Sequence, residues 1–267
     1  MFVFAITDPY LRIVTTVLAA LIGLCVGSFL NVVIYRVPLH MSLASPPSHC
    51  PACGYRLRPY DNIPILSYIM LRGRCRQCGT HISFRYTAVE AANMLLWTLC
   101  ALLFADNIGW MVLSAVSVSV CICIAFVDLE HTEIPDRFQV ALALPAIAAV
   151  FFDTAAPFWP QLIAAGVGFD SFFLVGKLVS LKKGREALGF GDVKFAAVAG
   201  LLLGWERLIL MVLLASVSAA VVLTVHNRRH GEDAEMPFAP FLCAGTLIAL
   251  LFGDRLIELY LMILSAP

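Results

Sequence analysis

Charged side chains are what this sequence has least of. Only 13% of its 267 residues are Asp, Glu, Lys or Arg, whereas soluble domains carry about a quarter. Because 61% are hydrophobic and the mean hydropathy is +0.89, the chain cannot cover a water-facing surface. This composition predicts a polytopic membrane protein in a lipid bilayer. The net charge is zero, which argues against nucleic acid as a partner.

A cleavable signal is also missing. The first hydrophobic run has no cationic segment before it and no small-residue cleavage site, so we expect it to be retained. Apolar runs near the ~20 residues needed to cross a bilayer occur eight times. They lie at 11–35, 88–105, 110–127, 138–152, 161–181, 190–204, 207–225 and 237–253. The predicted fold is therefore all-α, with about eight transmembrane helices. A last apolar piece, 256–264, is expected to lie at the interface or to extend the eighth span.

Lys and Arg are unevenly divided between the two sides of this topology. The loop after the first span holds seven of the eighteen: Arg36, Arg56, Arg58, Arg72, Arg74, Arg76 and Arg85. The opposite side has only Arg12, Arg207 and Arg255. Since cytoplasmic loops carry the excess of positive charge, the first loop is predicted to face the cytoplasm and both termini to face outward.

This loop contains four of the nine cysteines, in two Cys-x-x-Cys motifs, CPAC and CRQC. The other five lie in apolar runs and are interpreted as small buried side chains. In the reducing cytoplasm, the spacing C-x2-C-x21-C-x2-C predicts a closed, structural zinc site. Its ligands would be Cys50, Cys53, Cys75 and Cys78. Unliganded or redox-active thiols are the alternative.

Two carboxylates stand at predicted span ends on the cytoplasmic side. Asp128 ends the third span in AFVDLEHTEIPD, and Asp192 opens the sixth in GFGDVK. Two apposed carboxylates in a poorly hydrated site share a proton. One can then activate water while the other donates to a carbonyl, as in an aspartic peptidase. A helix N-cap or a solvated interfacial group remains the alternative for each.

Other ionisable residues near the spans have simpler interpretations. Glu130, His131, Glu133 and Asp136 form a cluster that could hold a metal, but a short solvated loop is favoured. Asp170 lies in the middle of the fifth span, where an ionisable residue marks a function by default, and it has no assigned role. The alternative function is a transporter or assembly factor. Its intramembrane aspartates would carry protons or cations, and the cysteine loop would be a docking module.

Five segments resemble, in order, those of bacterial type IV prepilin peptidases, also called leader peptidase/N-methyltransferases. They are VGSFLNVVIYRVP (26–38), the cysteine loop (50–78), DLEHTEIPD (128–136), GFGDVKFAAVAGLLLGW (189–205) and PFAPFLCAG (237–245). The resemblance covers essentially the whole chain. It implies a GxGD-type aspartic peptidase of the bacterial inner membrane that cleaves the leader from prepilins or pseudopilins at the cytoplasmic face. It also implies N-methylation of the new terminus with S-adenosylmethionine, in the service of a type IV pilus or type II secretion.

The same resemblance implies roles for individual residues. Asp128 and Asp192 match the catalytic pair, and the four paired cysteines match the metal-binding loop. The predicted organisation is a first transmembrane helix (1–37), a cytoplasmic zinc-binding loop (38–87) and a seven-helix membrane peptidase domain (88–267). No glycine-rich loop for S-adenosylmethionine follows a strand, so the residues that bind this cofactor are not identified.

Overall fold

The computed structural model describes residues 6, 8–152, 158–183, 188–230 and 236–265. The chain divides into two compact units, Met1–Met111 and Val112–Pro267. In the described ranges all regular elements are helices, joined by turns and two isolated β-bridges. The predicted all-α class is confirmed.

The first unit is built on two long helices, α1 (Pro9–Arg36) and α3 (Arg85–Leu103). Asp8 caps α1 by accepting the N–H groups of Tyr10 and Leu11 at 2.8 and 3.0 Å. The two helices approach closely at Gly27, because glycine has no side chain. A Cβ there would lie only 2.8 Å from the Cα of Glu90. Between them the chain forms the cysteine loop, with a 3-10 turn (Pro59–Asp61) and the short helix α2 (Leu66–Met70).

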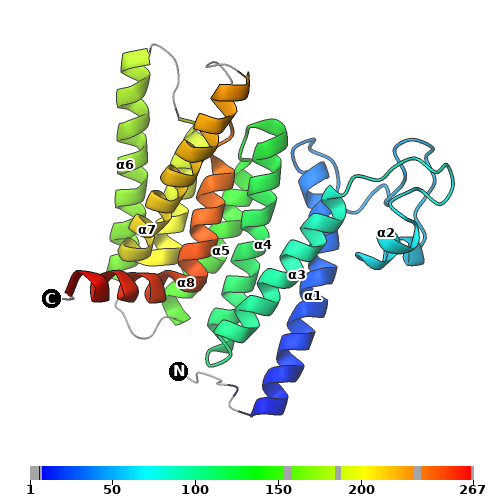
Figure 1. Cartoon of the computed structure of the whole chain (residues 1–267), viewed down its shortest axis with the longest axis horizontal. Coiled ribbons are helices and arrows are strands. Elements are labelled where there is room, and N and C mark those ends of the chain that lie inside the picture. The colour runs from blue at the N-terminus through cyan, green and yellow to red at the C-terminus, as the bar shows by residue number, and fades with distance from the viewer. Residues whose placement is uncertain (1–5, 7, 153–157, 184–187, 231–235, 266–267) are drawn as a thin grey trace. The chain divides into compact units, whose positions relative to one another are not determined.

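The second unit contains most of α4 (Ile108–His131) and all of the helices after it. These are α5 (Asp136–Phe152), α6 (Trp159–Lys183), α7 (Phe190–His230) and α8 (Ala239–Ser265). Helix α7 packs against α5, α6 and α8, so it forms the centre of the unit (Figure 1).

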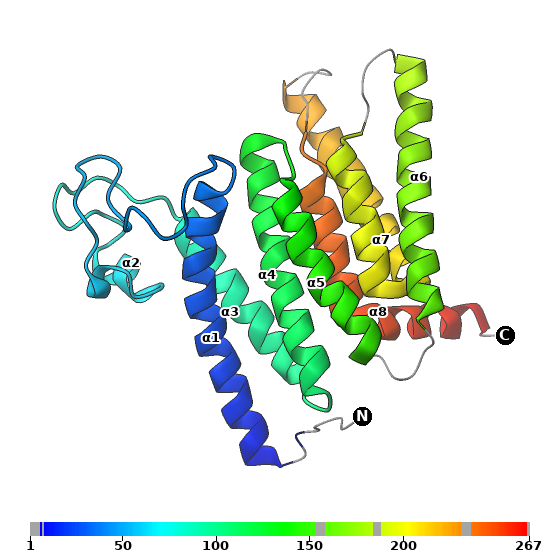
Figure 2. The same ribbon diagram turned by 180° about the vertical axis from the view of Figure 1, so that it is seen from behind.

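Helix α7 consists of two helical segments that meet at Gly204. This residue has φ 75° and ψ 174°, a conformation that glycine adopts without strain. The chain reverses there, so both ends of α7 lie at the same end of the unit (Figures 1 and 2). The sixth and seventh predicted spans are these two segments.

The remaining predicted spans coincide with α1, α3, α4, α5, α6 and α8. Among the described residues, five helices are long and apolar enough to cross a membrane: α1, α3, α4, α6 and α7. The last apolar piece, 256–264, extends α8. The C-terminal part of α8, in red, runs in a different direction from its N-terminal part, in orange (Figures 1 and 2).

Glycine-mediated contact between α6 and α7 yields a test of this packing. A Cβ on Gly168 would lie 2.6 Å from the carbonyl oxygen of Ala196, whereas one on Gly166, in the same helix, would meet no atom within 4 Å. We expect Gly168→Ala to destabilise the protein by about 1–3 kcal/mol through overpacking, and Gly166→Ala to stabilise it slightly. Thermal unfolding of both variants in detergent checks this, and equal melting temperatures would contradict it.

Candidate functional site

The paired cysteines of the first unit lie in two knuckles of the same shape. In each knuckle a glycine N–H donates to the carbonyl oxygen of the first cysteine at 2.9 Å: Gly54 to Cys50, and Gly79 to Cys75. Both glycines have φ 71°, in the left-handed region that favours this residue. The repeated pattern Cys-x-x-Cys-Gly therefore determines each turn locally.

The two knuckles bring four sulfur atoms together, from Cys50, Cys53, Cys75 and Cys78. All four lie within 4.8 Å of one another, and those of Cys50 and Cys78 are 3.9 Å apart. Thiolates bound tetrahedrally to Zn²⁺ at about 2.3 Å would be separated by roughly 3.8 Å. The cluster therefore has the size of a tetrahedral metal site and can bind a metal ion.

Backbone groups favour the ionised form of two of the four sulfurs, those of Cys50 and Cys78. The backbone of Tyr55 also lowers the pKa of Cys53, but burial and hydrogen bonds with the other three cysteines of the cluster raise it to about 12. The N–H groups of Cys53 and Ala52 lower the pKa of Cys50. The hydroxyl and the backbone of Thr80 lower the pKa of Cys78 to about 6. Since the thiolate is the form that binds metals, these contacts suit a metal-binding role.

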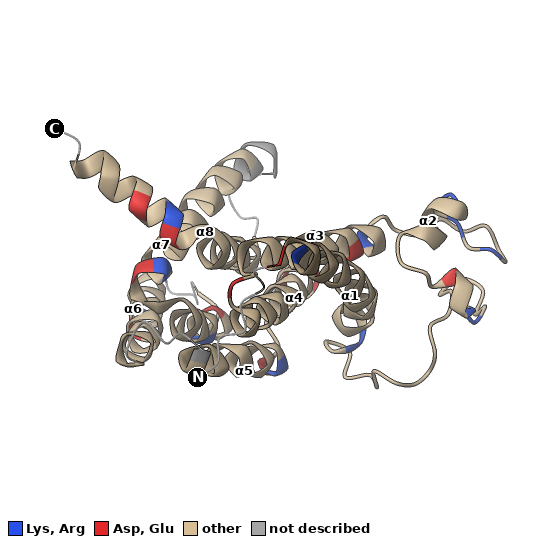
Figure 3. Ribbon diagram, turned by 90° about the horizontal axis from the view of Figure 1, so that it is seen from below, with Lys and Arg blue, Asp and Glu red and all other residues tan. Residues whose placement is uncertain are grey.

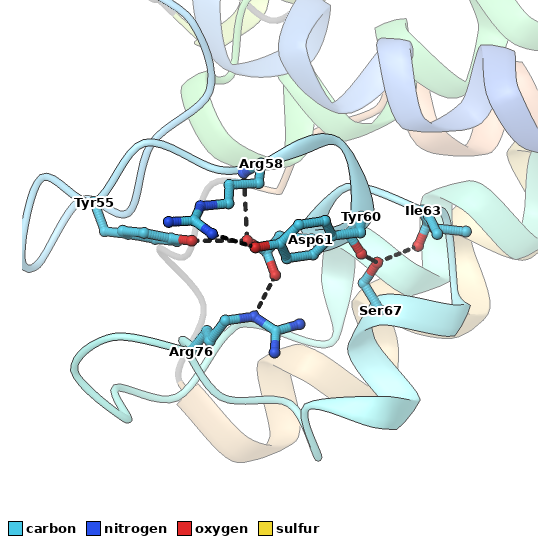
Figure 4. A network of polar contacts seen from close by, with 7 residues as sticks. All are labelled: Tyr55, Arg58, Tyr60, Asp61, Ile63, Ser67 and Arg76. Carbon is cyan, nitrogen blue, oxygen red and sulfur yellow. Dashed lines mark hydrogen bonds and ion pairs between the residues drawn. The ribbon is translucent and has the colours of Figure 1, made fainter.

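Asp61 joins the two knuckles (Figure 4). Its Oδ1 accepts a hydrogen bond from Arg76 Nε at 2.6 Å, and its Oδ2 accepts one from the Tyr55 hydroxyl at 3.0 Å and one from the Arg58 N–H at 3.3 Å. Burial raises the pKa of Asp61, but the bonds from Arg76, Tyr55 and Arg58 outweigh it and hold the pKa below its usual value. Because Tyr55 follows the first knuckle and Arg76 lies in the second, this carboxylate fixes one knuckle against the other.

The second unit brings together the two predicted carboxylates. Asp128, near the end of α4, is 6% exposed, and Asp192, in the first turn of α7, is half-buried. Their side chains are close enough for their charges to interact. The Oδ2 of Asp128 accepts the N–H of Ala239, the first residue of α8, at 3.0 Å. This places a carboxylate at the positive end of a helix.

The turn that carries Asp192 is fixed by contacts with the start of α5. Gln139 Nε2 donates to the carbonyl oxygen of Gly191 at 2.9 Å, and Gln139 Oε1 is buried without a hydrogen-bond partner among the described groups. A Cβ on Gly191 would lie 3.1 Å from that of Ile134. Lys194 pairs with Asp136 at 2.6 Å. The segment that carries Asp192 is therefore bound directly to the start of α5, which follows α4 and Asp128 in the chain.

The sequence motifs predicted no role for Gln139 or for the N–H of Ala239. A glutamine in the predicted fourth span was a possible signal for the former, whereas a backbone N–H carries no residue-type signal. Of the other polar residues at the end of α4 and just after it, all four members of the predicted cluster are exposed: Glu130, His131, Glu133 and Asp136. Asp170 is exposed on α6.

Comparisons with known proteins identify the family of the chain. Residues 21–104 match the family model described as the bacterial peptidase A24 N-terminal domain, and residues 115–224 match that of the type IV leader peptidase family. A prepilin leader peptidase/N-methyltransferase of Pseudomonas putida is 34% identical over 265 residues, covering 90% of this chain and 91% of the relative. The chain therefore belongs to the type IV leader peptidase family.

Further relatives carry the same name. One from Pseudomonas aeruginosa is 34% identical over 90% of this chain and 91% of its own length. One from Myxococcus xanthus is 44% identical over 75% of this chain, a match that spans 60% of that longer protein. No solved structure matches the chain. These relatives favour a peptidase over the transporter alternative.

Asp61 provides a test of how the loop is held together. In Asp61→Asn the bonds from Arg76, Tyr55 and Arg58 lose a charged acceptor, and charge-assisted hydrogen bonds contribute roughly 1.5–3 kcal/mol each. We expect faster proteolysis within residues 38–87 and weaker metal retention. Asp106→Asn is the control, since Asp106 is 75% exposed in its pair with Arg12 and such pairs contribute about 0–1 kcal/mol. Equal proteolysis rates in the two variants would show that Asp61 does not hold the knuckles together.

Proposed function

We propose that this protein is an aspartic endopeptidase that removes the leader from type IV prepilins or pseudopilins, with Asp128 and Asp192 as its catalytic pair. The observation that carries the proposal is the convergence of these carboxylates from the end of α4 and the start of α7, 64 positions apart in the sequence. Membership of the type IV leader peptidase family supports the reaction class.

The two carboxylates have unequal surroundings, which suggests their roles. The Ala239 N–H donates directly to Asp128 Oδ2 and stabilises negative charge there, so we assign Asp128 as the general base that takes a proton from water. Asp192 then holds the shared proton and donates it to the carbonyl oxygen of the scissile peptide. The tetrahedral intermediate collapses when Asp128 passes the proton that it took from water to the leaving nitrogen, which breaks the C–N bond. In the same step Asp192 recovers its proton from a hydroxyl of the intermediate.

The surrounding contacts have a positioning role in this mechanism. Gln139 fixes the backbone of Gly191, next to Asp192, and the Lys194–Asp136 pair joins the two flanking segments. A shift of about 1 Å in a reacting group can lower a rate about a hundredfold. The unpaired Oε1 of Gln139 is also available to accept a hydrogen bond from substrate or water.

The distribution of Lys and Arg supports a cytoplasmic location for this chemistry. By the positive-inside rule, the cysteine loop and the ends of α4 and α7 face the cytoplasm of a multi-pass inner-membrane protein. A substrate with a cytoplasmic leader and an apolar transmembrane helix has its scissile bond at that membrane edge. The carboxylates therefore meet the bond without drawing the helix out of the lipid.

The four-cysteine cluster is assigned to a structural zinc ion, held by Cys50, Cys53, Cys75 and Cys78. Because all four tetrahedral positions are filled by sulfur, the ion would stabilise the loop and leave no position open for catalysis. The names of the relatives include N-methyltransferase activity. On that basis we assign methylation of the new N-terminus, with S-adenosylmethionine as donor, as a second activity that requires the loop.

Replacing either carboxylate tests the peptidase. We expect Asp128→Asn and Asp192→Asn each to lower prepilin cleavage by at least about a hundredfold, the contribution of one general acid or base. Leader loss is followed by mass in detergent-solubilised protein. Asp170→Asn is the matched control, and we expect it to cleave at the unmodified rate. A catalytic variant that cleaves at that rate would remove its residue from the mechanism.

Metal removal separates the two activities. We expect Cys50→Ser to lose the zinc found by elemental analysis and to lose methylation, measured with labelled S-adenosylmethionine, while cleavage persists. Cys25 lies outside the cluster and is exposed on α1, whereas the sequence predicted it to be buried. Cys25→Ser is expected to keep zinc and both activities. Equal loss of cleavage and methylation in Cys50→Ser would contradict a separate role for the loop.

A further inference from the structure

Helix α2 exposes an apolar surface within the cysteine loop. Four apolar residues in α2 and just before it are 44–77% exposed. We call this set the α2 patch; its members are Ile63, Leu66, Ile69 and Met70. Contiguous apolar side chains in water mark a surface that something covers.

A hydrogen bond ties the segment that carries the α2 patch to α3 at a position inside that helix and not at its end. The N–H of Ile65 donates to Glu90 Oε2 at 2.8 Å, and Glu90 lies five residues inside α3. Glu90 also packs against Gly27 of α1, nine residues before Arg36 at the end of that helix. With a rise of 1.5 Å per residue, Glu90 lies roughly 8 Å along α3 from the start of that helix, and Gly27 lies roughly 13 Å along α1 from the end of that helix. Figures 1 and 2 show α2 beside these helices and below the end of α1.

This level lies within reach of the acyl chains of the bilayer. The apolar stretch 11–35 of α1 spans about 37 Å, longer than the ~30 Å hydrocarbon core. If the core is centred on that stretch, its edge falls near Ile34, and Gly27 lies roughly 9 Å inside. Interfacial amphipathic helices bury their apolar face to a depth of about 5–10 Å.

The charge of the loop identifies which lipid surface it suits. Residues 38–87 contain six arginines and one acidic residue, Asp61, which is buried and paired with Arg76. The loop therefore has arginines on its surface and no exposed carboxylate. Figure 3 shows the blue residues distributed along it. Arg72 and Arg74 are exposed and directly follow α2. Arginines near a membrane surface attract anionic headgroups.

We propose that α2 is a membrane-surface anchor that inserts the α2 patch among the acyl chains of the cytoplasmic leaflet. Arg72 and Arg74 bind the headgroups of anionic phospholipids there. The anchor continues directly into the second knuckle, since Cys75 follows Arg74 and the Ile82 N–H donates to the Gly73 carbonyl at 2.7 Å. Lipid contact thereby holds the four-cysteine cluster at a constant height above the bilayer.

The test places a photo-crosslinking amino acid at Met70 of the full-length protein. The protein is reconstituted in nanodiscs that contain tagged phosphatidylcholine and tagged phosphatidylglycerol. Gln77, which is exposed between Cys75 and Cys78 of the cluster, is the matched control position. We expect lipid adducts at position 70, several-fold above those at position 77. No lipid adduct at 70, or adducts there only to another helix or to a second copy of the chain, would overturn the proposal.

The charge component is tested in the same nanodiscs. With the crosslinker at position 70, we expect adducts to favour phosphatidylglycerol over phosphatidylcholine. The double variant Arg72→Gln/Arg74→Gln should lose that preference while it keeps lipid adducts and bound zinc. An unchanged preference would show that these arginines do not bind headgroups. Lipid contact is read out without a cleavage assay, so failure here leaves the proposed peptidase untouched.

Discussion

A polar group inside a bilayer must find its partner within the protein, because lipid offers none. In this chain a hydrogen bond that meets this requirement lies at the end of α4. There the Asp128 carboxylate accepts the N–H of Ala239, which has no partner inside its own helix because it belongs to the first turn. One hydrogen bond thus satisfies the start of α8 and fixes a carboxylate near Asp192. The arrangement of the second unit around its carboxylates depends on this contact.

Close helix packing follows from the same constraint. Helices in lipid gain little from apolar contact alone, so small residues that allow backbones to approach become the contact points. Gly27 between α1 and α3, and Gly168 between α6 and α7, are of this kind. Gly204 has a different role, because its positive φ reverses the chain. That reversal returns the second segment of α7 to the end of the unit where the first segment, with Asp192, begins.

The cysteine loop is stabilised differently, because it has little apolar core. Two local turns, a buried carboxylate and a cluster of sulfurs take the place of a core. Its apolar side chains at α2 are exposed, and its carbonyl and N–H groups reach back to α1 and α3. Arg36 at the end of α1 donates to the carbonyls of Ser42 and Pro46, and Glu90 accepts from Ile65. The loop is thus attached to the helices at both its beginning and its middle.

The sequence by itself determined the features that depend on local patterns. Hydropathy located the eight apolar segments, all of which form helices, because a segment that crosses a bilayer needs a long apolar run. The repeated Cys-x-x-Cys-Gly pattern determined both knuckles, because each closes over a few residues. The motifs around Asp128 and Asp192 identified the family. Only the tertiary structure decided what partners these residues have: the N–H of Ala239 for Asp128, Gln139 for the turn before Asp192, and Asp61 between the knuckles. The physical reason is that a hydrogen bond depends on the position of both groups in space. The backbone N–H of Ala239 is 111 positions from the carboxylate that it binds, and the residue types in the sequence do not indicate this contact.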